Sequence, residues 1–204
     1  MKIVLIRHGE SVDDILDCYG GAADWPLSDA GYQTAKDVAA GLADTNIEKI
    51  YSSPLKRAIQ TADEIELQKQ CGIITIEGLE ERNSYGVLSG CNKDECKELY
   101  GYLLKDLKGK PGDYYSDELV LGAEPGAEFD ARIKDALLAV VKDAEENNYN
   151  SVVVLTHGNA TRSIYKNLLN FEKKIDLDLL AKTEIEYSDG KFILVSNEGV
   201  YEKE

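Results

Sequence analysis

The chain contains two histidines, and each one follows a run of apolar residues and precedes a glycine. The first segment is KIVLIRHGE at residues 2–10, and the second is SVVVLTHGN at residues 151–159. A short run rich in β-branched residues that ends at a glycine is typical of a buried parallel strand. In open α/β sheets, ligands bind outside the carboxyl ends of such strands. The sequence therefore predicts that His8 and His157 face one pocket.

Strands and amphipathic helices alternate along most of the chain. We expect strands at 3–6, 49–51, 73–76 and 152–155, and a closing hairpin of residues 183–187 and 191–195 around an Asp189-Gly190 turn. Helices are expected after Ser28, from Ser53-Pro54 to about residue 70, over 129–141 and over 159–169, with Ser28 and Ser53 as N-caps. This order is typical of an α/β domain. We therefore expect one domain over 1–204, a three-layer sandwich with a mostly parallel central sheet flanked by helices.

The regular pattern breaks between residues 80 and 127. This stretch is rich in glycine and tyrosine and is too long for a plain connection. We therefore expect an insertion lobe or lid at about 80–127, with a helix of its own around Lys93 to Leu107.

Charge and composition narrow the class of protein. The formal net charge of -15 argues against nucleic acid or an anionic membrane as a partner, because both require a basic surface. No apolar stretch approaches the roughly 18 residues of a membrane span, and Met1 leads straight into a strand instead of a signal peptide. The four cysteines form no CxxC pair and are expected to be free thiols. A cytoplasmic protein is predicted.

Cationic residues flank both histidines. Arg7 precedes His8, and its planar fork of donors suits a phosphate. A guanidinium nearby also favours a neutral imidazole, the form that can act as a nucleophile. Arg57 is expected in the first turn of a helix, where the free N–H groups attract anions. His157 would add a donor to a phosphoryl oxygen, with Arg162 as a more distant charge.

Acidic residues at the entrance to the lobe complete the set. A carboxyl group at Glu80 or Glu81 could protonate a leaving oxygen, provided that partial burial raises its pKa. Two arginines, two histidines and one acid would form a cationic cage for a phosphomonoester in an otherwise acidic chain. A metal site on the two histidines is disfavoured, because Arg7 would repel the ion.

Several segments, in order along the chain, resemble the motifs of the histidine phosphatase superfamily, branch one, also called phosphoglycerate-mutase-like. They are RHGES at 7–11, DWPLS at 24–28 with Gly31, SSPLKRAIQTA at 52–62, PGAE at 125–128 and THGN at 156–159. The resemblance covers nearly the whole chain.

The resemblance implies that a ring nitrogen of His8 is phosphorylated while Arg7, Arg57 and His157 hold the phosphoryl group. It implies that Glu81 protonates the leaving alkoxide and then activates water, in a two-step transfer. No metal or other cofactor is implied, because the arginines supply the positive charge. Further contacts to a small phosphorylated substrate are expected from five residues: Ser11, Asn159, Tyr85, Asn92 and Lys93.

The segment LEERNSYGVLSGCNK at 79–93 is similar to the region around the catalytic acid of cofactor-dependent phosphoglycerate mutases, with one extra residue before Tyr85. That insertion leaves Glu80, like the later Glu128, as a competitor for the role of Glu81. The family's mutases carry a paired arginine in the lobe, whereas this chain has no arginine between Arg82 and Arg132. Lysines bind phosphate only as point charges.

We therefore expect a phosphomonoester hydrolase that acts on a small phosphorylated metabolite through a phosphohistidine. The alternative is a 2,3-bisphosphoglycerate-dependent phosphoglycerate mutase. A non-catalytic phosphate-recognition module is less favoured, because the whole set of His8, Arg7, Arg57, Glu81 and His157 is present. The sequence predicts neither the physiological substrate nor the oligomeric state.

Overall fold

The computed structural model describes residues 1–104 and 120–203. A central sheet in the order β3-β2-β4-β1-β5-β6 runs through these residues. Its strands are β1 (Lys2–Arg7), β2 (Lys49–Ser52), β3 (Ile73–Thr75), β4 (Ser151–Thr156), β5 (Ile175–Ser188) and β6 (Lys191–Glu202). Strands β3, β2, β4 and β1 are parallel, and β5 and β6 continue the sheet as an antiparallel pair.

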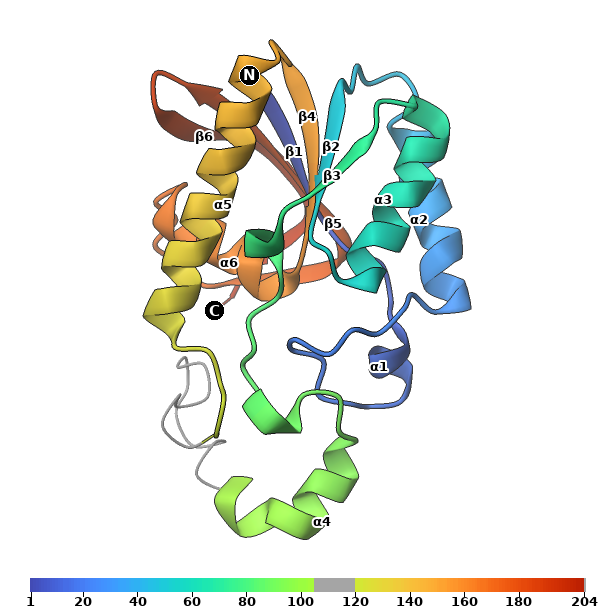
Figure 1. The fold of residues 1–204 in the computed structure, drawn as a ribbon, viewed down its shortest axis with the longest axis vertical. Coiled ribbons are helices and arrows are strands. Elements are labelled where there is room, and N and C mark those ends of the chain that lie inside the picture. The colour runs from blue at the N-terminus through green and yellow to red at the C-terminus, as the bar shows by residue number, and fades with distance from the viewer. Residues whose placement is uncertain (105–119, 204) are drawn as a thin grey trace.

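Helices cover both faces of the sheet (Figure 1). One face is covered by α2 (Asp29–Gly41) and α3 (Lys56–Lys69), and the other by α5 (Gly126–Glu146) and α6 (Gly158–Asn167). Successive side chains of a strand point to opposite faces. Accordingly, Ile3 and Leu5 of β1 pack toward α5 and α6, whereas Val4 and Ile6 pack toward α2 and α3. The expected three-layer α/β sandwich is confirmed.

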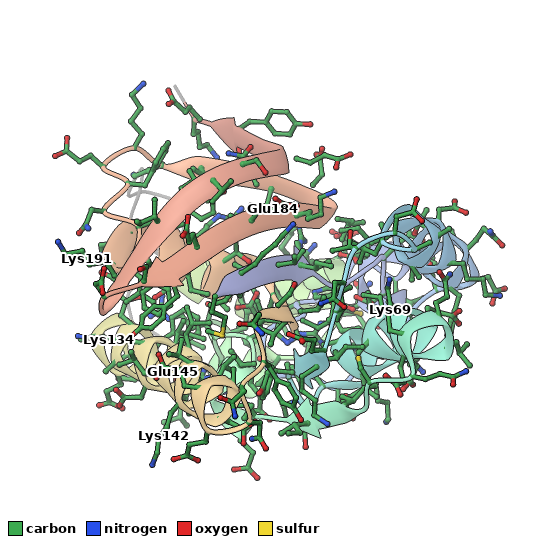
Figure 2. All side chains as sticks on the ribbon, turned by 90° about the horizontal axis from the view of Figure 1, so that it is seen from above. Lys69, Lys134, Lys142, Glu145, Glu184 and Lys191 are labelled. Atoms are coloured by element: carbon green, nitrogen blue, oxygen red, sulfur yellow. The ribbon has the colours of Figure 1, made fainter. Side chains whose placement is uncertain are left out.

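Seen from above, the outer surface of the helices is charged (Figure 2). Lys134, Lys142 and Glu145 lie on the exposed side of α5, while its buried side carries the apolar residues expected from the helical spacing. These are Phe129, Ile133, Leu137, Val140 and Val141. An amphipathic helix of this kind gains its stability by burying one apolar stripe.

A smaller group of elements lies beyond the carboxyl ends of the parallel strands, in the lower part of Figure 1. It comprises α1 (Val12–Ile15), the 3₁₀ turn η2 (Gly86–Leu88) and α4 (Lys93–Leu104), and the 3₁₀ turn η1 (Glu77–Leu79) connects it to the sheet. A bridge between Cys18 and Asn92 joins the loop after α1 to the start of α4. The helix expected around Lys93 to Leu107 is therefore present as far as Leu104, and the rest of that expectation lies outside the described residues.

The terminal hairpin is longer than expected. The sequence predicted strands of five residues each, whereas β5 and β6 extend over Ile175–Ser188 and Lys191–Glu202. The first part of β5 was missed because the strand contains an irregularity between Leu177 and Lys182. There Leu180 adopts a positive φ of 59° and the alternation of inward and outward side chains breaks. This bulge also brings the backbone N–H of Leu180 to the carbonyl oxygen of His8.

No helix within residues 1–104 and 120–203 has the length and apolar content to cross a bilayer.

Candidate active site

The two histidines lie side by side at the carboxyl edge of the sheet. His8 follows β1 and His157 follows β4, and these strands pair in parallel with Arg7 opposite Thr156. The ring centroids of the two histidines are 5.0 Å apart. Both side chains are buried, at 6% and 0% exposure. The strand pattern thus brings His8 and His157 together at one edge of the sheet.

The hydrogen bonds of His8 define its tautomer. Its Nδ1 lies 2.7 Å from the carbonyl oxygen of Gly9, and its Nε2 lies 3.2 Å from the Nε of Arg57. A carbonyl oxygen only accepts and a guanidinium only donates. Nδ1 therefore carries the proton, and the lone pair of Nε2 points to Arg57. Burial, together with the charges of Arg57 and Arg7, holds the pKa of His8 well below its usual range, so the ring is neutral.

His157 has one bonded and one unbonded ring nitrogen. Nε2 lies 2.7 Å from the hydroxyl of Ser53, while Nδ1 is buried without a partner. Burial, followed by the charge of Arg57, lowers the pKa of His157 well below its usual range. A buried polar atom without a partner is costly. Nδ1 is therefore a position where a bound ligand would restore a hydrogen bond.

The two arginines are fixed by backbone carbonyl groups. Arg57 donates to the carbonyl oxygens of Ala23 at 2.7 Å and Gly21 at 3.0 Å, and the φ of +51° at Gly21 favours glycine. Arg7 donates to Leu177 in β5 at 2.7 Å, while its Nε is buried without a partner. Burial lowers the pKa of both guanidinium groups, and the carboxylate of Glu81 opposes this effect. Both remain cations at neutral pH.

Glu81 lies closer to this cluster than its two competitors. Of the carboxylates near Arg7 and Arg57, it is the one that most strongly raises the pKa of both guanidinium groups. Its Oε2 accepts from the backbone N–H of Asn159 at 3.1 Å, and its Oε1 accepts from that of Arg82 at 2.8 Å. Glu80 instead lies near Arg132. Burial raises the pKa of Glu80, and the charge of Arg132 offsets part of this effect. Glu128 is exposed in the first turn of α5.

The remaining expected contact residues are distributed unevenly. Ser11 is buried and donates to Asp13 at 2.6 Å, and Asn159 stands in the first turn of α6. Tyr85 packs against Tyr19, with ring centroids 4.6 Å apart and the rings tilted by 38°, and it lies beside Gly21, whose carbonyl oxygen holds Arg57.

The other two expected residues bond within the lobe. The side chain of Asn92 caps α4 by accepting from the backbone N–H groups of Asp94 and Glu95. Lys93 forms an ion pair with Asp17 at 2.6 Å. Both side chains therefore bond to groups of the lobe and of the loop after α1, and they serve the packing of the lobe.

The structure also assigns site positions that the sequence did not. Ser53 was expected to cap a helix, and this is wrong: α3 begins at Lys56 with Leu55 as its N-cap. The Ser53 hydroxyl instead accepts from the backbone N–H of Leu55 at 3.3 Å, ahead of the helix, and lies 2.7 Å from Nε2 of His157. Thr61 accepts from the backbone N–H of Gly9 at 3.2 Å and donates to the carbonyl oxygen of Arg57 at 2.7 Å. The sequence signal for the bond between Thr61 and Arg57 was a hydroxyl residue four positions, about one helical turn, after Arg57.

Among residues 1–104 and 120–203, no three side chains of His, Cys, Asp or Glu gather in a way that could hold a metal ion. The groups that surround His8 are instead guanidinium donors, whose chemistry fits an anion.

The comparisons with known proteins agree with this geometry. The family model described as "Histidine phosphatase superfamily (branch 1)" matches residues 3–198. The chain belongs to the histidine phosphatase superfamily. The expected resemblance is thus confirmed, and with it the expected chemistry of an enzyme that acts on small phosphomonoesters through a phosphohistidine.

This histidine phosphatase has relatives with two different reactions. It is 30% identical over 175 residues to phosphoserine phosphatase 1 of Hydrogenobacter thermophilus, a match that covers 84% of this chain and 78% of that one. It is also 30% identical over 210 residues to a 2,3-bisphosphoglycerate-dependent phosphoglycerate mutase of Streptococcus thermophilus, with coverage of 91% and 89%. The crystal structure of a phosphoglycerate mutase from Bacillus anthracis shares the fold, with a TM-score of 0.81, 23% identity and coverage of 96% and 92%.

Proposed function

We propose that this histidine phosphatase hydrolyses a small phosphomonoester, with His8 as the nucleophile. The observation that carries the proposal is the cluster of His8, His157, Arg7 and Arg57, in which two buried nitrogens, Arg7 Nε and His157 Nδ1, have no partner. Donors that converge around one nucleophile and lack a partner fit the oxygens of a phosphoryl group.

In the first step, the lone pair of His8 Nε2 attacks phosphorus. A phosphorus–nitrogen bond forms while the bond from phosphorus to the ester oxygen breaks. Arg57 transfers its hydrogen bond from His8 to a phosphoryl oxygen, and Arg7 and His157 bind the others. Glu81 donates a proton to the leaving alkoxide, which departs as the alcohol.

In the second step, Glu81 accepts a proton from water, and the oxygen of that water attacks phosphorus. The phosphorus–nitrogen bond breaks, which returns the electron pair to Nε2 and releases inorganic phosphate. The hydrogen bond from Nδ1 of His8 to Gly9 supports both steps: it keeps the lone pair of Nε2 free for the first attack, and because Nδ1 retains its proton, the ring leaves as a neutral imidazole in the second. Glu81 is thus the acid of one step and the base of the next.

Hydrolysis is favoured over the mutase reaction by the bonds of the cations near the lobe. A mutase must bind a bisphosphate, which requires additional cationic donors. Arg132 forms two bonds of 2.8 Å with the carboxylate of Glu124, and Arg82 donates to the backbone carbonyl of the same residue. Lys93 and Lys97 are paired with Asp17 and Asp94. In the described part of the lobe, these cations are therefore already engaged.

The test is phosphate release from a panel of small phosphomonoesters that includes phosphoserine and 3-phosphoglycerate, with and without 2,3-bisphosphoglycerate, followed by phosphorus NMR. Free phosphate without any 2-phosphoglycerate supports the phosphatase. Appearance of 2-phosphoglycerate that depends on the bisphosphate would establish the mutase instead. The absence of both reactions, with no trapped phosphohistidine, would favour a phosphate-recognition module. Turnover is expected to persist in a chelator.

We propose in addition that the protein works in the cytoplasm without nucleic acid or membrane as a partner. The support is its acidic net charge of -15 and its cysteines, which are all free thiols in the structure. Cell fractionation tests this proposal, and recovery with the membrane or nucleic-acid fraction would contradict it.

A further inference from the structure

A third arginine lies against the catalytic cluster. Arg162 stands on α6, and its guanidinium folds back over the first turn of the helix. A Cβ atom added at Gly158 would lie 3.2 Å from Nη1 of Arg162 and 3.6 Å from Nε of Arg7. The two guanidinium groups thus meet at a glycine that leaves room for both. Two cations held this close repel each other unless an anion lies between them or beside them.

The present partners of Arg162 fix its position but leave its fork weakly bonded. Nε donates to the carbonyl oxygen of Ile175 at 3.1 Å, which anchors the side chain to β5. The two terminal nitrogens reach Asn159 Oδ1 and Asp176 Oδ1 at 3.5 Å each, the outer limit of a hydrogen bond. Asp176 is also shared with Lys203 at 3.2 Å. The Arg162 side chain is 30% exposed, so a ligand can reach it.

The position of Arg162 relates it to the leaving group. Nη1 is next to Asn159, and the backbone N–H of Asn159 holds Oε2 of Glu81. Glu81 is the residue proposed to protonate the leaving oxygen. A substituent on the carbon skeleton of the leaving group is therefore within reach of Arg162 while the phosphoryl group contacts His8.

We propose that Arg162 binds a carboxylate on the leaving group while Arg7 beside it holds the phosphoryl group, so that the preferred substrates are small phosphorylated carboxylic acids. The proposal rests on the proposed function and specifies its substrate class. The planar fork of an arginine matches a carboxylate with two parallel bonds. A singly charged carboxylate also suits a subsite that already contains Asp176, whereas a second phosphate would meet stronger repulsion there.

The test compares two substrates that differ only in the carboxylate, phosphoserine and phosphoethanolamine. The wild-type enzyme is expected to show a higher kcat/KM for phosphoserine. Arg162→Gln is expected to lower kcat/KM for phosphoserine by about 10- to 100-fold, the value of a hydrogen-bonded charge pair, and to leave phosphoethanolamine within about threefold. Lys166→Gln is the matched control, since Lys166 is exposed on the same helix and paired with Asp130. Lys166→Gln is expected to leave kcat/KM unchanged for both substrates.

Two kinetic outcomes would overturn the proposal. An equal loss on both substrates would mean that Arg162 only positions Arg7 or anchors β5. Unchanged kinetics on phosphoserine would mean that no carboxylate contacts it. Retention of part of the discrimination in Arg162→Lys would support the charge as the cause.

A binding measurement separates this proposal from the proposed function. If the wild-type protein releases no phosphate from any ester, the proposed hydrolysis fails, and calorimetric titration of His8→Ala with the same two ligands still tests the subsite. Tighter binding of phosphoserine than of phosphoethanolamine, lost on addition of Arg162→Gln, supports the carboxylate contact. Equal affinities for the two ligands in His8→Ala, or a difference that survives Arg162→Gln, would overturn it.

Discussion

Arg57 donates from Nε to the Nε2 atom of His8 over 3.2 Å, while the other two nitrogens of its guanidinium are held by the carbonyl oxygens of Ala23 and Gly21. The bond aligns the lone pair of His8 and opposes protonation of the ring, since a second positive charge beside Arg57 is unfavourable. In the proposed reaction, Arg57 therefore orients the nucleophile before substrate arrives, and it is in place to bind the phosphoryl group once that group is attached to His8.

The first prediction concerns the phosphoenzyme. His8→Ala is expected to abolish turnover and to remove the acid-labile, base-stable label that a phosphohistidine leaves on the protein, because Nε2 of His8 is the proposed nucleophile and His157 is assigned to a phosphoryl oxygen. Rapid quench with a ³²P-labelled ester measures this label. His157→Asn is the matched comparison, and it is expected to slow labelling while retaining it. Full labelling of His8→Ala would assign the nucleophile to another residue.

The fold was predictable because its signals are local. The apolar runs before His8 and His157, and the helical spacing of Phe129 through Val141, follow directly from the periods of strand and helix. The length of β5 was not predictable in the same way. Its alternation breaks at Leu180, and it is the pairing with β6 on both sides of this irregularity, at Ile175–Leu177 and again from Lys182, that makes β5 one long strand.

The site was predictable to the extent that its residues follow strands. His8, Arg7 and His157 lie at strand ends, so their convergence follows from parallel pairing. The role of Ser53 was missed, because a serine before a proline reads equally well as a helix cap, and only the tertiary fold brings His157 to its hydroxyl. Arg162 was expected to be a distant charge, yet its guanidinium lies over the first turn of α6 beside that of Arg7, where Gly158 has no side chain to separate them.

The second prediction identifies the acid. Glu81→Gln is expected to slow hydrolysis of an alkyl phosphate by about 100-fold or more, in the usual range for general acid catalysis, and to slow p-nitrophenyl phosphate much less. The reason is that p-nitrophenolate leaves without a proton, whereas an alkoxide requires one. Steady-state kinetics on the two esters measures the difference. Burst kinetics shows whether breakdown of the phosphoenzyme then becomes limiting.

Glu80→Gln is the matched control, because Glu80 is adjacent to Glu81 in the sequence but interacts mainly with the charge of Arg132. Its kinetics are expected to stay close to those of the wild type on both esters. A leaving-group effect in Glu80→Gln and none in Glu81→Gln would exchange the two assignments.

The third prediction concerns the bond between Ser53 and His157. Ser53→Ala removes the partner of His157 Nε2 and frees the ring to rotate, so kcat/KM is expected to fall by about tenfold, the value of one buried hydrogen bond. Ser52→Ala serves as the control, since Ser52 is equally buried and bonds only to the carbonyl oxygen of Ser53. Equal losses of activity in both variants would reduce the role of Ser53 to general packing.

The fourth prediction is a dependence of stability on pH that comes from the two histidines. Burial and the neighbouring arginines hold the pKa of His8 and of His157 well below the ordinary value of 6.5. Below pH 6.5 the unfolded chain therefore binds protons that the folded protein excludes. The free energy of unfolding then falls as the pH decreases, by up to about 1.4 kcal/mol per pH unit for each histidine. Urea unfolding at pH 7.5, 6.5 and 5.5 measures this slope.

Substitution of the histidines separates this contribution from that of the carboxylates. The chain has no other histidine, so His8→Gln/His157→Gln is expected to show nearly constant stability between pH 6.5 and 5.5, and each single variant is expected to show about half the wild-type slope. The comparison uses slopes, so it holds even if the variants differ in absolute stability. Carboxylates with ordinary pKa values titrate mainly below this window. An unchanged slope in the double variant would mean that the buried rings at the sheet edge are not the source of the acid sensitivity.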